Sequence, residues 1–396
     1  MIDISGANSL RTVGTSDLFQ ILRDGTPRTR AELAALTGLA RSTVAQRVDA
    51  LMRLGLVSPT ADAASTGGRP SAQFALDARN KVVLAVDIGA SHIHIAVSDL
   101  AGTILVEDST PLEVASGPEA VLGWVAEAGA ALIDAARRSA AHLLAVGVGL
   151  PGPVEHSSGR PINPPIMPGW DRFDVPGALR AKFDVPVLVD NDVNIMALGE
   201  RELSWPDIDH LIFVKVATGI GAGVISGGYL QRGAQGIAGD IGHVQISRGR
   251  DVVCRCGNNG CLEALASGES LAHSLRERGL AADGAQGVID LVKRGNLEAI
   301  QAVRQAGRDL GEVLTTCVSL MNPSVIVIGG SMAYAGEHLI AGVREVIYTR
   351  STPLATQHLH ITQSGVGPQA AVVGAAMLAI HHALSPERVD AMVTSN

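Results

Sequence analysis

The chain has 396 residues, of which 46% are hydrophobic and 18% are charged, and its formal net charge is −8. This length favours two or three domains over a single core, the apolar content excludes a disordered protein, and the negative charge excludes a protein that coats nucleic acid. No apolar run reaches the roughly 18 to 20 residues of a membrane span, and the N-terminus lacks the apolar segment of a signal peptide. We therefore expect a cytoplasmic protein without a membrane partner, in which closely spaced cysteines favour a metal site over a disulfide.

Charge is distributed unevenly along the chain. Residues 1–80 carry nine arginines against seven carboxylates, a net charge of +2 that leaves −10 for the remaining residues. A mildly basic head on an acidic body is typical of one DNA-contacting module joined to a part that does not contact DNA.

The sequence of the head, residues 1–80, predicts two helices around a tight turn. Thr29 is followed three residues later by Glu32, which makes a capping box, and Gly38 allows the turn. In a helix-turn-helix, the first turns of the second helix enter the major groove, where Arg and Gln pair with base edges. The apolar face of that second helix is expected at Val44, Val48, Leu51 and, less strictly, Leu54. The expected DNA-contacting residues on its early turns are Arg41, Ser42, Thr43, Gln46 and Arg47.

The segment after these helices completes the pattern of a winged helix. Residues 56–76 form two extended stretches around a glycine-rich tip, as the wing of such a domain does. Arg69 at the tip is placed to reach the minor groove or a phosphate. We therefore predict a winged helix-turn-helix DNA-binding domain over residues 1–80; the alternative is a small helical cap with surface arginines.

From about residue 81 the pattern changes to short buried strands alternating with helices. A β-branched run with a glycine break predicts a hairpin with Asp87 at the end of its first strand. Four later segments run a strand into glycines, and such turns allow backbone amides to approach phosphate. These segments are residues 143–154, 185–200, 210–228 and 325–336. With Asp87 and Asp192 at strand ends, the pattern predicts an α/β fold with a two-lobed phosphotransferase cleft.

Three of the four cysteines lie within eight positions, shortly after a histidine. The stretch "GDIGHVQI" followed by "CRCGNNGCLE" resembles the ExGH and CxCGxxGCxE motifs of the ROK family (repressor, open reading frame, kinase). The stretches "VDNDVNIMALGE" and "VIVIGGS" are also similar to that family, so the resemblance covers about residues 81–385. It implies an actin-like, hexokinase-type (ribonuclease H-like) domain over residues 81–396.

The resemblance also implies how this domain is divided. Two lobes are expected, roughly at residues 81–195 and 196–385, with the C-terminal helix returning to the first lobe. With the head included, the whole chain resembles a sugar-responsive ROK transcriptional repressor, of the kind that senses xylose, N-acetylglucosamine or glucose.

The zinc motif of the family implies a structural Zn²⁺ site. Its ligands here are His243, Cys254, Cys256 and Cys261. Three thiolates and one imidazole complete a tetrahedral site with no open position for water, so we expect no catalytic role for the metal. Gly257 and Gly260 make a tight loop suited to wrapping an ion; the alternative is a set of buried, unligated cysteines. Cys317 is expected to belong to the core.

The resemblance further implies a sugar site. Family members bind sugar hydroxyls through the ExGH motif, the glutamate of GCxE and an Asn-Asp pair, and a glycine lies against the sugar. The matching residues here are Gly152, Asn191, Asp192, Asp240, His243 and Glu263. Carboxylates and amides accept from or donate to neighbouring hydroxyls, so the inventory fits a sugar. Asp240 is one methylene shorter than the glutamate of the family.

In the kinases of the family, the aspartate of the Asn-Asp pair is the general base, and two glycine-rich turns hold ATP phosphates and Mg²⁺. The part of this sequence that matches the nucleotide-binding turns departs from that pattern. The residues at matching positions are Asp87, Gly89, Thr218, Gly219, Gly221, Gly329 and Gly330. However, Ala90, Ser91 and His92 stand where kinases carry Gly, Thr and Lys, and Ala217 replaces the first glycine of the second turn. Added side chains there hinder the close approach of phosphate to the backbone.

These observations predict a repressor of sugar uptake or metabolism whose affinity for double-stranded operator DNA is controlled by a sugar effector. A homodimer or a dimer of dimers is expected, because one winged helix reads one half-site. An active ATP-dependent sugar kinase that also binds DNA is the alternative, with Asp192 as its base and ATP/Mg²⁺ as cofactors. A purely architectural DNA-binding protein would have no use for the cleft.

Overall fold

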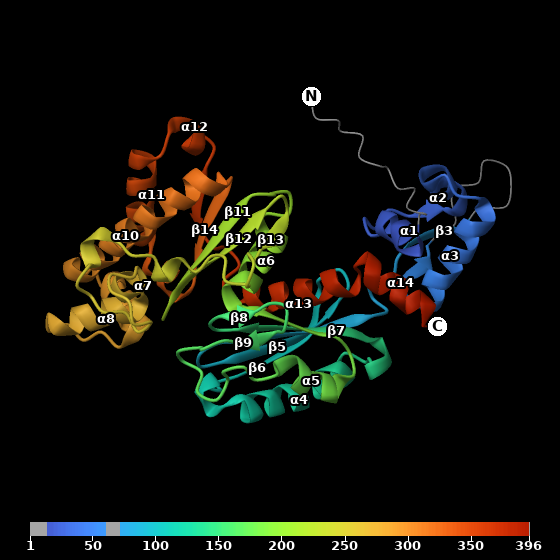
Figure 1. Ribbon diagram of the computed structural model, residues 1–396, viewed down its shortest axis with the longest axis horizontal. Coiled ribbons are helices and arrows are strands. Elements are labelled where there is room, and N and C mark those ends of the chain that lie inside the picture. The colour runs from blue at the N-terminus through green and yellow to red at the C-terminus, as the bar shows by residue number, and fades with distance from the viewer. Residues whose placement is uncertain (1–13, 61–71, 396) are drawn as a thin grey trace.

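The computed structural model describes residues 14–60 and 72–395 (Figure 1). Its head has three helices and a small sheet of order β1-β3-β2, in which both pairings are antiparallel. The elements of the head are α1 (Thr15–Leu22), β1 (Arg28–Thr29), α2 (Arg30–Thr37), α3 (Arg41–Arg53), β2 (Val57–Pro59) and β3 (Gln73–Leu76). This is the predicted winged helix-turn-helix, with the tip of its wing outside the described residues.

Local signals account for the two helices of the head. The Thr29 hydroxyl accepts a hydrogen bond from the backbone of Glu32 (3.2 Å), and the Glu32 carboxylate accepts one from the backbone of Thr29 (2.7 Å). Gly38 ends α2 in the left-handed conformation, with φ of 70°. Val44, Val48 and Leu51 of α3 are buried, as their helical spacing predicts.

The first lobe contains a five-stranded sheet of order β10-β7-β4-β5-β6. Its strands are β4 (Val82–Ile88), β5 (Ile93–Asp99), β6 (Ile104–Thr110), β7 (Leu143–Leu150) and β10 (Val187–Asn191). β4, β5 and β6 pair antiparallel, whereas β4, β7 and β10 pair parallel. The helices α4 (Pro118–Ala135) and α5 (Val175–Phe183) cover one face (Figure 1), and a small hairpin joins β8 (Val154–Glu155) to β9 (Arg160–Pro161).

The second lobe repeats this topology in a sheet of order β13-β12-β11-β14-β15. The strands are β11 (Leu211–Val216), β12 (Ile220–Ser226), β13 (Tyr229–Gln231), β14 (Val325–Gly329) and β15 (His360–Gln363). Its helices are α7 (Glu263–Ala266), α8 (Gly268–Glu277), α9 (Gly284–Lys293), α10 (Leu297–Met321), α11 (Glu337–Arg350) and α12 (Pro353–Thr356). As in the first lobe, three strands (β11, β12 and β13) pair antiparallel, and β11, β14 and β15 pair parallel. Two such lobes define the actin-like, hexokinase-type fold that the sequence predicts.

Two helices lie between the lobes: α6 (Asp192–Ser204) and α13 (Gln369–Ala383) (Figure 1). They approach so closely that a Cβ atom on Gly374 would lie 1.6 Å from the backbone oxygen of Ile195. Glycine is required there because any side chain would separate the two backbones. On its other side α13 packs against β4 and β7 of the first lobe.

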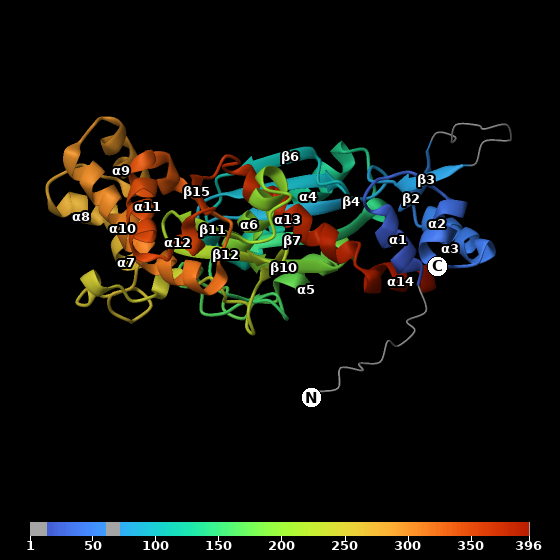
Figure 2. The same ribbon diagram turned by 90° about the horizontal axis from the view of Figure 1, so that it is seen from above.

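The last helix, α14 (Pro386–Thr394), contacts α1 of the head. Ser16 donates from its backbone and hydroxyl to the carboxylate of Asp390 at 3.1 and 2.7 Å, and Gln20 donates to the backbone oxygen of Leu384 at 2.9 Å. Leu18 and Phe19 share one apolar core with α13. The head therefore docks on the C-terminal helices at one end of the molecule, with the second lobe at the other end (Figures 1 and 2).

Within the described ranges, no helix has both the length and the apolar character that crossing a membrane requires.

Candidate functional site

A cavity of about 590 Å³ lies between the two lobes. Its walls come from the start of α6, the turn between β11 and β12, and loops of both lobes around residues 151–166 and 236–243. This volume is in the range of sites that bind small molecules. All six residues predicted to bind sugar line it: Gly152, Asn191, Asp192, Asp240, His243 and Glu263.

The amide of Asn191 has partners within the protein. Its oxygen accepts from the backbone of Val193 (3.0 Å) and so caps α6, and its nitrogen donates to the backbone oxygen of Gly152 (2.6 Å). Gly152 has φ of 100°, which only glycine adopts readily. Asn191 thus joins the loop at Gly152 to the first turn of α6, which begins with Asp192.

Asp192 is paired with a lysine that sequence reasoning missed. Lys215 Nζ lies 2.5 Å from Asp192 Oδ2, and the two side chains are 28% and 11% exposed. Burial alone would lower the pKa of Lys215, but the charge and hydrogen bond of Asp192 and the charge of Asp87 raise it overall, so the side chain is an ammonium. The available signal was a single lysine within the otherwise apolar strand β11.

His92 covers the first predicted phosphate turn. A Cβ atom added to Gly89 would lie 2.2 Å from the His92 ring, so the ring occupies the space above this backbone. His92 Nε2 is 3.6 Å from Asp87 Oδ2, and this contact with Asp87 raises the pKa of His92 against the effect of its partial burial. Asp87 and Gly89 are therefore engaged by a side chain of the same hairpin.

The other predicted nucleotide residues divide into two groups. Thr218, Gly219 and Gly221 line the cavity. Packing accounts for the remaining two glycines: a Cβ atom on Gly329 would lie 2.3 Å from the ring of Phe213, and one on Gly330 would lie 2.5 Å from the backbone oxygen of Val216. Neither of these glycines needs a bound phosphate to explain it.

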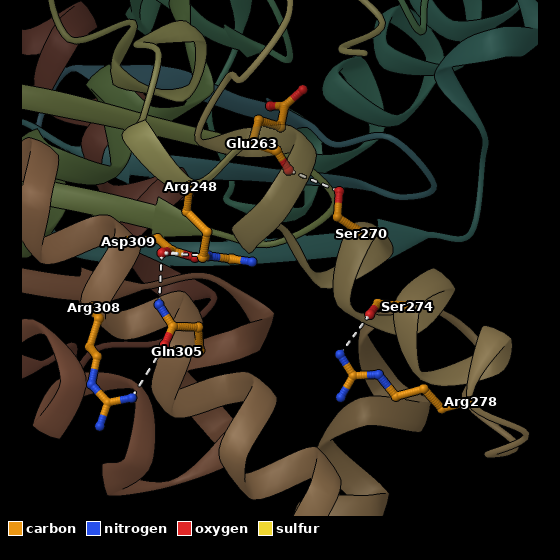
Figure 3. A network of polar contacts seen from close by, with 8 residues as sticks. All are labelled: Arg248, Glu263, Ser270, Ser274, Arg278, Gln305, Arg308 and Asp309. Atoms are coloured by element: carbon orange, nitrogen blue, oxygen red, sulfur yellow. Dashed lines mark hydrogen bonds and ion pairs between the residues drawn. The ribbon is translucent and has the colours of Figure 1, made fainter. Parts of the chain in front are cut away.

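Glu263 is held at the edge of the cavity by contacts at both ends. Its carboxylate accepts from the backbone of Ile220 (3.0 Å), and its backbone oxygen accepts from the hydroxyl of Ser270 (2.9 Å) (Figure 3). Nearby, Arg248 Nε donates to the buried carboxylate of Asp309 on α10 at 3.1 Å (Figure 3). The segment from Arg248 to Glu263, which carries the three clustered cysteines, is therefore fixed at both ends to the rest of the second lobe.

The four predicted zinc ligands come together. The ligand atoms of His243, Cys254, Cys256 and Cys261 all lie within 4.8 Å of one another. Cys254 Sγ is 3.7 Å from His243 Nδ1, and Cys256 Sγ is 3.7 Å from Cys261 Sγ. Zinc–sulfur bonds of about 2.3 Å at tetrahedral angles place two sulfurs about 3.8 Å apart, so the spacing fits Zn²⁺.

The loop and the thiols are consistent with a metal site. Gly257 and Gly260 take positive φ values of 91° and 79°, which allow the chain to turn around the four ligand atoms. Burial raises the pKa of Cys261 to about 12, so holding it as a thiolate requires a nearby cation. Cys317 lies apart from this cluster, half-buried on α10 against the core of the second lobe.

The exposed start of α3 carries most of the predicted DNA contacts. Arg41, Ser42 and Gln46 are exposed, and Thr43 is half-buried. Arg47 differs from the prediction of a solvent-facing side chain, because it is half-buried and donates to the backbone oxygen of Gly14 (3.2 Å) at the start of α1. The list of predicted DNA contacts also includes Arg69, which lies outside the described residues.

Two parts of the chain match two different families of known proteins. Residues 83–382 match the ROK family, and residues 15–60 match the IclR helix-turn-helix domain. The chain is 29% identical over 370 residues to a putative xylose repressor of Caldicellulosiruptor sp. (strain Rt8B.4), covering 90% of this chain and 92% of the relative. It is 27% identical over 384 residues to the DNA-binding transcriptional dual regulator NagC of Escherichia coli K12, covering 93% of each.

Two solved structures share the fold. A ROK family transcriptional regulator, described as a homolog of the E. coli MLC protein, matches with a TM-score of 0.82 at 23% identity over 96% of this chain and 98% of its own. The ROK hexokinase from Thermus thermophilus matches with a TM-score of 0.65 at 30% identity over 75% of this chain and 97% of its own. The regulator thus matches nearly the whole chain, and the hexokinase three quarters of it.

The fold and the site define a class of protein in which a hexokinase-type domain carries a DNA-binding head. The chain belongs to the ROK family. That family includes sugar kinases as well as sugar-responsive repressors, and the curated relatives above are named as regulators of transcription.

Proposed function

We propose that this ROK-family protein is a transcriptional repressor that binds operator DNA through its winged helix and is controlled by a sugar in the cavity between its lobes. The observation that carries the proposal is the combination, on one chain, of an exposed recognition helix with a sugar-type cavity in which Asp192, the match to the general base of the family's kinases, is paired with Lys215. A structural Zn²⁺ held by His243 and the three clustered cysteines completes the second lobe. The named functions of the relatives support the same function.

The state of the nucleotide side favours sensing over catalysis. Asp192, the residue that would take a proton from a sugar hydroxyl, has Lys215 at 2.5 Å, and the His92 ring covers Gly89. Ala90 and Ala217 line the cavity where the resemblance predicts glycines. Kinase activity remains the second candidate function, because Asp192 and the turn from Thr218 to Gly221 are retained.

A continuous set of helices connects the proposed sugar site to the head. Asp192 begins α6, α6 packs backbone to backbone on α13, and α14 then holds α1 through Ser16 and Asp390. A sugar changes DNA affinity only if it binds better to one arrangement of this assembly than to another. The two arrangements are the lobes open without sugar and closed on the sugar. The movement between them would reach the head through α13 and α14.

Operator binding measured against a sugar panel tests the proposed function. We expect at least one neutral pentose, hexose or amino sugar to raise the melting temperature of the full chain and to weaken its binding to operator DNA. ADP release is measured with the same sugars, ATP and Mg²⁺, and we expect none above background. Sugar-dependent ADP release would instead establish the kinase, and the absence of any sugar effect on operator binding would contradict a sugar-controlled repressor.

The start of α3 predicts a distinct effect on DNA recognition. Arg41→Ala and Gln46→Ala are each expected to cost about 1 to 3 kcal/mol of operator binding and to relax base preference at particular positions, because their side chains are exposed where α3 meets the major groove. Arg53→Ala, at the opposite end of the same helix, serves as the control. Binding to a library of operator variants measures both effects. Unchanged base preference in both variants would contradict this placement of α3.

A further inference from the structure

We propose that the ion pair between Asp190 and Arg232 is a latch that joins the two lobes beside the cavity and favours their closed arrangement. This inference rests on the proposed function, to which it adds the residues that set the balance between open and closed lobes. Three observations carry it: the burial of the pair, its position between the lobes, and the seating of the loop that carries Arg232 on the first lobe.

Asp190 is buried near the end of β10, and only 3% of its side chain is exposed. Its two carboxylate oxygens face different partners. Oδ1 accepts from the backbone of Asn191 (2.8 Å) and from the side-chain amide of Asn194 (2.7 Å), where α6 begins. Oδ2 accepts from Arg232 Nε at 2.6 Å. One carboxylate therefore joins the first turn of α6 to a side chain of the second lobe.

Arg232 is the cation that balances this buried charge. Its side chain is 22% exposed, so the pair is largely shielded from solvent. His156 also faces Asp190, with its Nδ1 3.9 Å from Oδ2. However, burial and the charge of Arg232 lower the pKa of His156, so its ring is neutral at pH 7. A buried carboxylate that loses its only charged partner is strongly unfavourable, so separating the pair requires water to reach Asp190.

The pair crosses from one lobe to the other. Asp190 lies in the sheet of the first lobe, whereas Arg232 directly follows β13 in the sheet of the second lobe. The backbone after Arg232 stays with the second lobe, because Ala238 donates to the backbone oxygen of Arg232 (3.1 Å) and Ala222 on β12 donates to that of Gly239 (2.8 Å). Any increase in the separation of the lobes at this point must stretch or break the pair.

The loop of residues 232–239 is also seated on the first lobe. A Cβ atom on Gly236 would lie 2.6 Å from the backbone oxygen of Val154 and 3.0 Å from the backbone nitrogen of His156. The loop therefore meets the β8–β9 hairpin backbone to backbone, at a residue whose φ of 94° favours glycine. Both sides of this contact line the cavity, Gly236 and the three residues after it from the second lobe and Pro153 from the first. The latch thus holds one wall of the cavity together.

The latch predicts effects of opposite kind on sugar and on operator. In the proposed function, the closed lobes bind sugar and release operator. The apparent affinity for a ligand scales with the fraction of molecules already in the arrangement that binds it. Loss of the latch should therefore weaken sugar binding, while operator affinity without sugar stays the same or rises. Loss of a residue that only stabilised the fold would lower both affinities.

Three substitutions of Arg232 in the full-length protein test the latch. Arg232→Met removes the charge and the hydrogen bond, Arg232→Gln keeps a neutral donor at the position of Nε, and Arg232→Lys keeps the charge on a side chain that reaches one bond further. The sugar concentration that releases operator should rise about ten-fold or more with Met, less with Gln and least with Lys. Arg304→Met, which breaks an exposed pair with Glu345 inside the second lobe, is the matched control and should leave this concentration unchanged.

Small-angle X-ray scattering without sugar tests the latch separately from the proposed function. We expect a larger radius of gyration for Arg232→Met than for the unsubstituted chain, and no increase for Arg232→Lys. If Arg232→Met does not fold, the same comparison is made with Arg232→Gln. An unchanged radius would overturn the latch, and so would a loss of sugar-free operator affinity in the folded variant. If no sugar acts on the unsubstituted chain, the proposed function fails, whereas a larger radius still supports the latch.

Discussion

Cys256→Ser is expected to abolish stoichiometric zinc binding and to lower the melting temperature of the second lobe sharply. Structural zinc contributes folding free energy directly, about 10 to 16 kcal/mol in zinc-finger peptides, and a site with three of its four ligands loses much of that contribution. Cys256 is the informative position because it is exposed, whereas Cys254 and Cys261 are buried. Its loss therefore removes a ligand without opening a cavity in the core.

Metal analysis and thermal unfolding measure these two effects. The unsubstituted chain, purified without chelators, should contain about one zinc per chain, as a single site of four ligands requires. Cys317→Ser is the control, because Cys317 lies outside the cluster and should leave the zinc content unchanged. Freshly purified protein that contains no zinc would contradict the metal site. So would a Cys256→Ser variant with normal zinc content and stability.

Asp192→Asn is expected to weaken sugar binding and to blunt the effect of sugar on operator affinity, while operator binding without sugar stays near normal. A hydrogen bond to a charged partner contributes about 1.5 to 3 kcal/mol, against about 1 kcal/mol for a neutral one, so affinity should fall by roughly two- to thirty-fold. The substitution also removes the ion-pair partner of Lys215. The contacts that hold the head on the C-terminal helices are made by Asp390 and Leu384 and do not involve Asp192, so the head should keep its sugar-free arrangement.

The same substitution separates sensing from catalysis. If Asp192 works as a general base, the unsubstituted chain must turn over ATP with some sugar, and Asp192→Asn should reduce that turnover by roughly 100-fold or more. Asp283→Asn, an exposed carboxylate before α9, is the control and should change neither sugar binding nor turnover. Sugar-dependent ADP production that disappears only in Asp192→Asn would replace the repressor proposal with the kinase.

Local patterns in the sequence determined much of this protein. The capping box at Thr29 and the spacing of Val44, Val48 and Leu51 predict α2 and α3, because they depend on residues within one or two helical turns. The alternation of short buried strands with helices predicts the α/β lobes. Three of the four residues that could hold a metal ion are cysteines within eight positions, so this cluster too is largely encoded in adjacent residues.

Contacts between distant segments were decided only by the tertiary structure. Lys215 and Asp192 are 23 positions apart, and Ser16 and Asp390 are 374 apart. No periodicity relates such residues, because their proximity depends on how sheets and helices pack after they form. The packing of α6 against β11 and β12 places Asp192 beside Lys215, and its close approach to α13 at Gly374 joins it to the C-terminal helices that reach the head. The sequence thus determined which groups the chain contains, and packing decided that Asp192, in the cavity between the lobes, would be paired with a lysine.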